Sequence, residues 1–177
     1  NSITIPIIPT ACAPNKRIPS TVPSGAAKPR PFDLIKLMLH SIATSALYIG
    51  AALSFLAGLL HIACIFVGAS AFRFLGAGEK LALMSERGHW YPPFIALVIG
   101  TVLILWSAYA LAGAGVLPKL PYTQVALAAI AAVFLMRAIG FPLLKPAFPE
   151  NSQRFWLLTS SICFVIGIAY LIGVVGT

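Results

Sequence analysis

Four runs of apolar residues fill the later part of the chain, and short polar segments separate them. The predicted runs are residues 48–72, 93–115, 122–141 and 155–175. An α-helix rises about 1.5 Å per residue, so roughly 20 apolar residues cover the ~30 Å hydrocarbon core of a bilayer. Each run is long enough for one crossing. The pattern therefore predicts an all-α integral membrane domain over residues 38–177, built as a four-helix bundle.

Small and polar side chains recur at steps of three and four residues within the first run. Ser54, Ala57, His61, Cys64 and Gly68 fall on one face of the predicted helix, and mainly Leu, Ile and Phe lie opposite. Membrane helices bury small and polar residues against each other and leave large apolar ones to lipid. We therefore expect this face to point into the bundle.

Residues 1–37 follow a different pattern from the four runs. Prolines and basic residues are frequent here, among them Pro14, Lys16, Arg17 and Pro19. Proline at this density prevents helix formation, so we expect a disordered tail. The first methionine is Met38, directly before the apolar region. Two alternatives stay open: translation begins at Met38, or the tail belongs to the native protein.

Composition and charge agree with a membrane protein. The chain is 59% hydrophobic and 9% charged, whereas soluble domains are about a quarter charged. The net charge of +8 would suggest nucleic acid in a soluble protein. Here the basic residues flank apolar runs, where membrane proteins carry them, so no nucleic-acid partner is predicted.

The distribution of lysine and arginine predicts the orientation. The two longer connections and their borders contain Arg73, Lys80, Arg87, Lys145 and Arg154. If translation starts at Met38, the positive-inside rule places these connections in the cytoplasm. If the tail is native, its lysines and arginines lie on the opposite side of the membrane and roughly cancel this difference in positive charge. We predict a multi-pass protein of the bacterial cytoplasmic (inner) membrane, with both termini on the same side, outside.

Arg137 is the first candidate for a functional residue. A charge inside a membrane span is costly and indicates a site by default, here one for an anion such as a lipid phosphate or a carboxylate substrate. The alternative is structural. Pro142 ends the predicted helix about a turn later, so the side chain can reach the interface.

His61 and Cys64 form an HxxC pair on one helical face. The pair suggests a metal or haem ligand, or a proton relay. A metal site needs more converging ligands, and haem needs a second axial partner or an open position. His40 and His89 lie outside the runs. No cofactor is therefore predicted, although haem or quinone stays possible, and the structural alternative is a hydrogen bond from His61 across the bundle.

Three further groups are considered. Glu79, Glu86 and His89 could perform acid–base chemistry, or residues 79–87 form a charged helix on the membrane surface. Trp106 and Tyr109 are large, partly polar residues of the second run and are ligand-binding candidates. The runs contain no acidic residue, which argues against a proton-driven antiporter of the small multidrug type.

Residues 48–177 are similar to small four-span bacterial inner-membrane proteins of uncharacterised activity. The similarity rests on the HxxC run, on RFLGAGE at residues 73–79 and on WYP at residues 90–92. It implies no activity and transfers no catalytic residue. The four-span size also resembles quinone-linked respiratory accessory subunits of the DoxX type, with no diagnostic motif in common.

The sequence leaves three functions open. The leading prediction is binding of a lipid-like or quinone-like ligand between the helices, or service as an accessory membrane subunit. An intramembrane enzyme using His61, Arg137 or the Glu79/Glu86/His89 connection is the alternative, and a transporter of small solutes is the third. The expected partners are the lipid bilayer, such a ligand, and a second copy or a membrane subunit.

Overall fold

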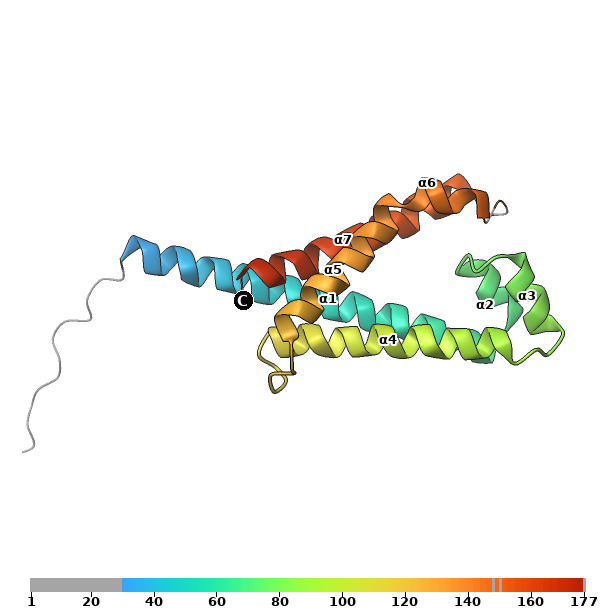
Figure 1. The fold of residues 1–177 in the computed structure, drawn as a ribbon, viewed down its shortest axis with the longest axis horizontal. Helices are drawn as coiled ribbons and strands as arrows, with labels where there is room; N and C mark the ends of the chain where they lie inside the picture. Colours follow the sequence, from blue (N-terminus) through green and yellow to red (C-terminus); the bar gives the residue numbers. More distant parts are fainter. Residues whose placement is uncertain (1–29, 148, 150, 177) are drawn as a thin grey trace, which may run out of the picture. The chain divides into compact units, whose positions relative to one another are not determined.

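The computed structural model describes residues 30–147, 149 and 151–176, so most of the predicted tail lies outside the described residues. The regular elements of the described part are all helices (Figure 1). They are α1 (Pro31–Val67), α2 (Ala69–Phe74), α3 (Glu79–Glu86), α4 (Tyr91–Gly113), α5 (Thr123–Ile139), α6 (Phe141–Leu144), the 3-10 turn η1 (Lys145–Ala147) and α7 (Gln153–Gly176). All contacts below lie within residues 31–177, which form one unit.

Three helices are long and apolar enough to cross a membrane: α1, α4 and α7. Helix α5 is apolar but has 17 residues, which makes it a shorter helix than the other three. Helix α4 begins with prolines in its first turn, where the missing N–H groups would have had no helical partner. The membrane character of the fold is thus confirmed, with three long apolar helices among the described residues.

The first helix differs from its prediction at both ends. It begins at Pro31, so residues 31–37, assigned to the disordered tail, are helical. Proline is well suited to a first helical position, and the apolar residues that follow continue the helix. It ends at Val67 because Gly68 takes φ 77°, a left-handed conformation that glycine adopts readily. Helix α1 therefore begins 17 residues before the predicted run 48–72 and ends five residues before the end of that run.

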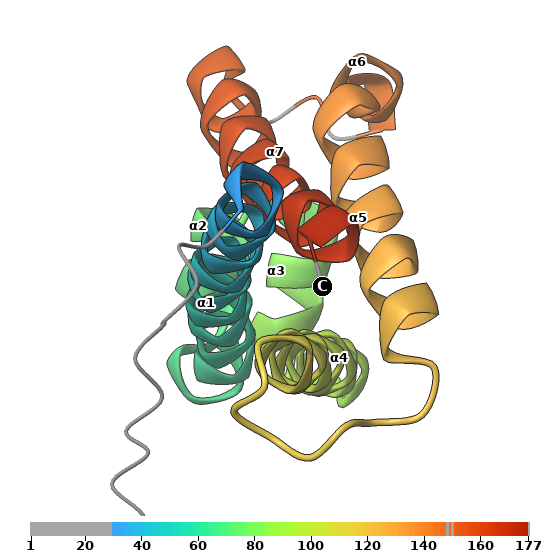
Figure 2. The same ribbon diagram turned by 90° about the vertical axis from the view of Figure 1, so that its left-hand side faces the viewer.

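The long helices lie side by side, so their connections gather at two ends, which we call the turn end and the loop end. The turn end holds the α4–α5 connection and the end of α7, where the His40 ring lies 3.4 Å from the Gly176 carbonyl oxygen. The loop end holds α2, α3 and the segment around α6, and Asn151 Nδ2 donates there to the Gly76 carbonyl at 3.0 Å. Helix α4 lies beside α1, and α5 lies beside α7 (Figures 1 and 2).

Glycines allow α1 and α4 to approach at backbone distance. A Cβ added to Gly58 would lie 2.9 Å from the Gly100 carbonyl oxygen, and a Cβ added to Gly100 would lie 2.9 Å from the Gly58 oxygen. Real Cβ atoms need more room, so only glycine fits at this crossing. This is the small-residue contact that membrane helices use in place of a hydrophobic driving force.

Tyr170 of α7 joins the helices at the centre of the bundle. Its side chain is fully buried, and its hydroxyl donates to the Trp106 carbonyl of α4 at 2.9 Å and lies 3.1 Å from the Ser54 hydroxyl of α1. Its ring stacks on Phe134 of α5, with 6.0 Å between centroids. The predicted inward face of the first run is confirmed for Ser54 and Cys64, which are both buried.

We expect Tyr170→Phe to lower the free energy of unfolding by about 1 kcal/mol or slightly more, the usual range for an internal hydrogen bond. Ser54→Ala should cost less, because the bond to the Trp106 carbonyl remains. Unfolding in detergent micelles measures both changes. Tyr122→Phe is the control, since Tyr122 is 83% exposed. Equal effects of the Tyr170 and Tyr122 substitutions would contradict the central role of this hydroxyl.

Candidate functional site

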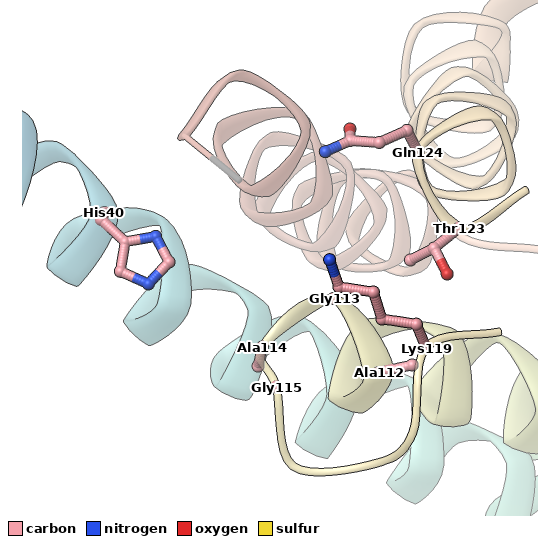
Figure 3. A pocket seen from close by; sticks show the side chains of 8 residues that line it. All are labelled: His40, Ala112, Gly113, Ala114, Gly115, Lys119, Thr123 and Gln124. Atoms are coloured by element: carbon pink, nitrogen blue, oxygen red, sulfur yellow. The ribbon is translucent and has the colours of Figure 1, made fainter.

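A hollow of about 310 Å³ lies at the turn end, between α1, the end of α4 and the start of α5. Its polar lining consists of His40, Lys119, Thr123 and Gln124, and residues 112–115 supply small side chains and backbone. Figure 3 shows the Lys119 ammonium and the Gln124 amide pointing toward the hollow, with the His40 ring across from them. We call this hollow the turn pocket.

Local sequence explains why the chain opens here. Gly115 has φ 79°, a left-handed conformation in which the chain turns away from the axis of α4. Tyr122, the residue directly before α5, has φ 56°. Two prolines between them prevent a continuous helix. The Thr123 hydroxyl donates to the Leu120 carbonyl at 2.6 Å and fixes the last turn before α5. Lys119 is an exposed residue of this connection between α4 and α5.

The turn pocket is rich in hydrogen-bond donors and positive charge. Lys119 carries an ammonium group, Gln124 an amide and His40 an imidazole, and no carboxylate is among the lining residues. The first N–H groups of α5 also lie here and have no side-chain cap, which adds partial positive charge. Such a lining suits an anionic or strongly polar group.

A second hollow continues along the same pair of helices. It measures about 200 Å³ and is lined by Trp106, Tyr109, Ala126, Ala129, Ile130 and Val133. Large aromatic side chains of α4 face small alanines of α5 here, and this difference in size leaves the space open. The rings of Trp106 and Phe134 pack edge to face, with 5.4 Å between their centroids. We call it the α4–α5 crevice. Its apolar lining suits a hydrocarbon or ring system.

The two hollows follow each other along shared helix faces. Tyr109 of the crevice and Gly113 of the turn pocket are four residues apart on α4, and Thr123 and Ala126 are three apart on α5. Residues at these spacings lie on the same side of a helix. The structure therefore places the predicted candidate Tyr109 about one turn, and Trp106 about two turns, from a polar pocket.

His61 and Cys64 each have a hydrogen bond within their own helix. The His61 Nδ1–H donates to the Ala57 carbonyl at 2.8 Å, and the Cys64 thiol donates to the Leu60 carbonyl at 3.4 Å. The expected alternative, a bond from His61 across the bundle, is therefore wrong for Nδ1, which is used within its own helix. Over the part of the chain that the structure describes, no group of three or more His, Cys, Asp or Glu residues is placed to hold a metal ion.

Arg137 lies in the last turn of α5, half-buried. Its guanidinium carbon is 5.2 Å from the centre of the Trp156 ring, a cation–π arrangement between α5 and α7. One of its terminal nitrogens, Nη1, is buried and has no hydrogen-bond partner. Snorkelling alone does not describe this geometry, because a snorkelling side chain would place its donors in water.

The acidic residues of the loop end are engaged by Arg73. Its Nε and Nη2 donate to both oxygens of Glu79 at 2.9 and 2.7 Å, and its Nη1 donates to Glu86 at 2.7 Å. These bonds lower the pKa of Glu79 below its ordinary value, and burial offsets the effect only in part. His89 is exposed. The bonds to Arg73 favour the charged surface helix over acid–base chemistry.

Sequence reasoning did not select His40, Lys119 or Gln124 as candidates. One signal was present: Lys119 is the only charged residue between Arg87 and Arg137. The convergence of Lys119 with His40 depends on where α1 passes the α4–α5 connection, and this is a tertiary property. No hydrophobic pattern along the chain contains it.

Comparisons with protein-family models, curated proteins and solved structures give no match for this chain. The resemblance to small four-span inner-membrane proteins therefore stays a prediction.

We predict that the contacts of α3 loosen in acid. Because the folded pKa of Glu79 is depressed, its contribution to stability is complete above its ordinary pKa of about 4.5 and is lost as the pH falls through the lower folded value. Hydrogen exchange of the α3 amides, corrected for intrinsic rates, measures this. Arg73→Gln should remove the pH dependence and Lys80→Gln should keep it. An identical acid response in both variants would argue against the Arg73 pairing.

Proposed function

We propose that the protein binds an amphipathic ligand, lipid-like or quinone-like, with its polar head in the turn pocket and its apolar part in the α4–α5 crevice. One observation carries this proposal. Donors from Lys119, Gln124 and His40 converge one helical turn from an apolar crevice lined by aromatic rings. Ligand sites combine a mostly apolar lining with a few polar groups in this way.

The membrane setting supports the same proposal. We infer four spans rather than three, because α5 packs along α7, with Leu135 against Gly167 and Phe134 on Tyr170. A helix in that position shares the hydrocarbon layer with α7. At about 1.5 Å per residue its length is close to the thickness of a bilayer core, and α6 extends it. The resemblance noted above favours a bacterial cytoplasmic membrane.

The proposed orientation places the loop end in the cytoplasm. Arg73, Lys80, Arg87, Lys145 and Arg154 all belong to the segments at that end. The turn end carries Lys119 in its connection. The positive-inside bias then favours α1 starting, and α7 ending, on the outer side.

Cysteine labelling tests the four spans and the orientation together. In a chain whose native cysteines are replaced by alanine, Lys119→Cys and Lys145→Cys flank α5. We expect an impermeant maleimide added to intact spheroplasts to label the cysteine at position 119. The cysteine at position 145 should be labelled only after lysis. Labelling of both from one side would show that α5 does not cross. The reverse pattern would keep four spans and invert the orientation.

Ligand binding is tested with oleate, which has an anionic head, and decylubiquinone, which is neutral. Ala129→Phe fills the crevice and should weaken both, whereas Ala132→Phe, one turn away on the same helix and outside the crevice, should weaken neither. Lys119→Gln should weaken oleate about three- to tenfold, because a charged hydrogen bond to the head is lost, and should leave decylubiquinone unchanged.

Native mass spectrometry of the detergent-solubilised protein provides the measurement for both probes. Lys80→Gln is the control for the loss of one positive charge, because Lys80 lies in α3 at the loop end. Failure of the wild-type chain to retain either probe would overturn the proposal. Equal binding by the Ala129→Phe and Ala132→Phe variants would show that the ligand does not occupy the α4–α5 crevice.

A further inference from the structure

A seven-residue repeat of exposed positions runs along α1. Every seventh residue of one series is large and aliphatic: Ile35, Ile42, Ile49 and Leu56. A second series follows each of these by three residues: Met38, Ser45, Ala52 and Leu59. All eight residues are exposed. Alternating steps of three and four residues place the eight side chains in one stripe, which we call the α1 seam.

The α1 seam lies opposite the face of α1 that packs into the bundle. Within residues 43–58 of α1 the buried residues are Ala43, Leu47, Gly50, Ala51, Ser54 and Gly58. With 3.6 residues per turn, their mean direction lies about half a turn from the seam. Contacts with α4 and α7 therefore use one side of α1 and leave the seam to a neighbour outside the described helices.

Helix α1 is longer than the helices that pack against it. It has 37 residues, whereas α4 has 23 and α7 has 24, a difference of roughly 20 Å at about 1.5 Å per residue. Gly113, the last residue of α4, lies against Leu47, and Gly176, the last residue of α7, lies against Ala43. Residues 31–38, which include the first part of the seam, therefore continue past the ends of both helices (Figure 1).

The charged residues of α1 avoid the seam. They are Asp33 and Lys36, and His40 follows at the next helical step. Steps of three and four residues put these three side chains on one face, and that face continues the buried face of the helix. Ile35 and Met38 point away from it, in a segment beyond the ends of α4 and α7, where the protein leaves the hydrocarbon layer. Apolar side chains near water favour a protein neighbour that covers them.

A hollow beside the seam provides room for a side chain of a facing helix. It measures about 400 Å³ and lies between α1 and α4. Six residues of the two helices line it: Tyr48, Ala51, Ala52, Phe55, Ser107 and Leu111. In knobs-into-holes packing, a side chain of one helix enters a space between four residues of the other. The four α1 residues, two alanines between two aromatic rings, form such a space.

We propose that two copies of this chain pair in parallel through the α1 seam, as a two-stranded coiled coil. Both copies cross the membrane in the same direction, so a two-fold axis along the membrane normal brings identical α1 positions together. Isoleucine at the first position of each heptad is typical of parallel two-stranded coiled coils. Ser45 and Ala52 at the other position let the backbones approach closely, as small residues do between membrane helices. A strict seven-residue period gives the pair a left-handed supercoil.

The second copy accounts for the observations on α1 together. It covers Ile35 and Met38 where α1 has passed the ends of α4 and α7, and it continues along the same stripe inside the bilayer. Asp33 and Lys36 lie off the seam, so parallel pairing brings neither charge against its own copy. The pairing uses no residue of the α4–α5 crevice, and ligand binding there is a separate question.

Cysteine crosslinking in the membranes of the expressing cells tests the pairing. In a chain whose native cysteines are replaced by alanine, Ile35→Cys and Ile42→Cys place thiols in the seam. Leu37→Cys and Thr44→Cys are the matched controls, each two residues later and on the other side of the helix. We expect oxidation with copper phenanthroline to link the seam variants into dimers and to leave the controls monomeric, because a disulfide needs Cβ atoms within about 4.5 Å.

A bulky residue in the seam provides a second test. Ala52→Phe should weaken dimerisation about tenfold, because the added ring separates closely packed helices. Ala132→Phe, the same change at an exposed position of α5, should leave dimerisation unchanged. Native mass spectrometry at several protein concentrations measures both.

Several outcomes would overturn this assignment. Equal crosslinking of the seam and control cysteines would show random collision, and no crosslinking at either seam position would assign this face to lipid. A crosslinked product that contains another protein would assign it to a different subunit. Equal dimerisation of the Ala52→Phe and Ala132→Phe variants would also contradict the pairing. If Ala52→Phe does not fold, the cysteine variants decide alone.

Discussion

The Tyr170 hydroxyl is the polar contact on which the arrangement of the helices depends. A hydroxyl inside a bilayer has no water to bond, so it must find partners on other helices or bear the cost. Here the partners are the Ser54 hydroxyl and the Trp106 carbonyl. The ring needs room, and Gly50 provides it: a Cβ there would lie 3.1 Å from the ring. One side chain thereby fixes α7 against α1 and α4, and its stacking on Phe134 fixes α5.

The same constraint leads to the candidate site. Because the Trp106 carbonyl is held by Tyr170 and the Trp106 ring packs on Phe134, this part of α4 keeps one rotation relative to α5. Tyr109 lies nearly one turn further on the same face of α4. Small α5 residues such as Ala126 and Ala129 cannot fill the space beside these aromatic rings, which leaves the crevice open. A central hydrogen bond and a surface hollow are therefore consequences of one packing arrangement.

The sequence predicted the later helices well and the first one poorly, for physical reasons. Helices α4, α5 and α7 begin and end within about two residues of prediction, because proline, glycine and loss of apolar character coincide at their ends. At the first run they do not coincide: the fairly apolar residues 34–47 continue the helix back to Pro31, and Gly68 ends it inside an apolar stretch. For the sites, an apolar pattern identifies Trp106 and Arg137 as unusual. It cannot show that His40 and Lys119 line the same hollow, because this depends on where α1 passes the α4–α5 connection.

Lys119 of the turn pocket and Arg137 lie near opposite ends of α5, and the helix dipole affects these two cations differently. Arg137 lies in the last turn, where the partial negative charge of the carbonyls stabilises a cation, and the Trp156 ring adds to this. The chain itself therefore offsets part of the cost of burying Arg137. Lys119 instead lies beside the first turn of α5, where the dipole is also positive, so charge and dipole repel. An anion in the turn pocket would relieve both. The turn pocket thus has positive charge and no carboxylate in its lining, whereas Arg137 keeps one buried guanidinium nitrogen without a hydrogen-bond partner.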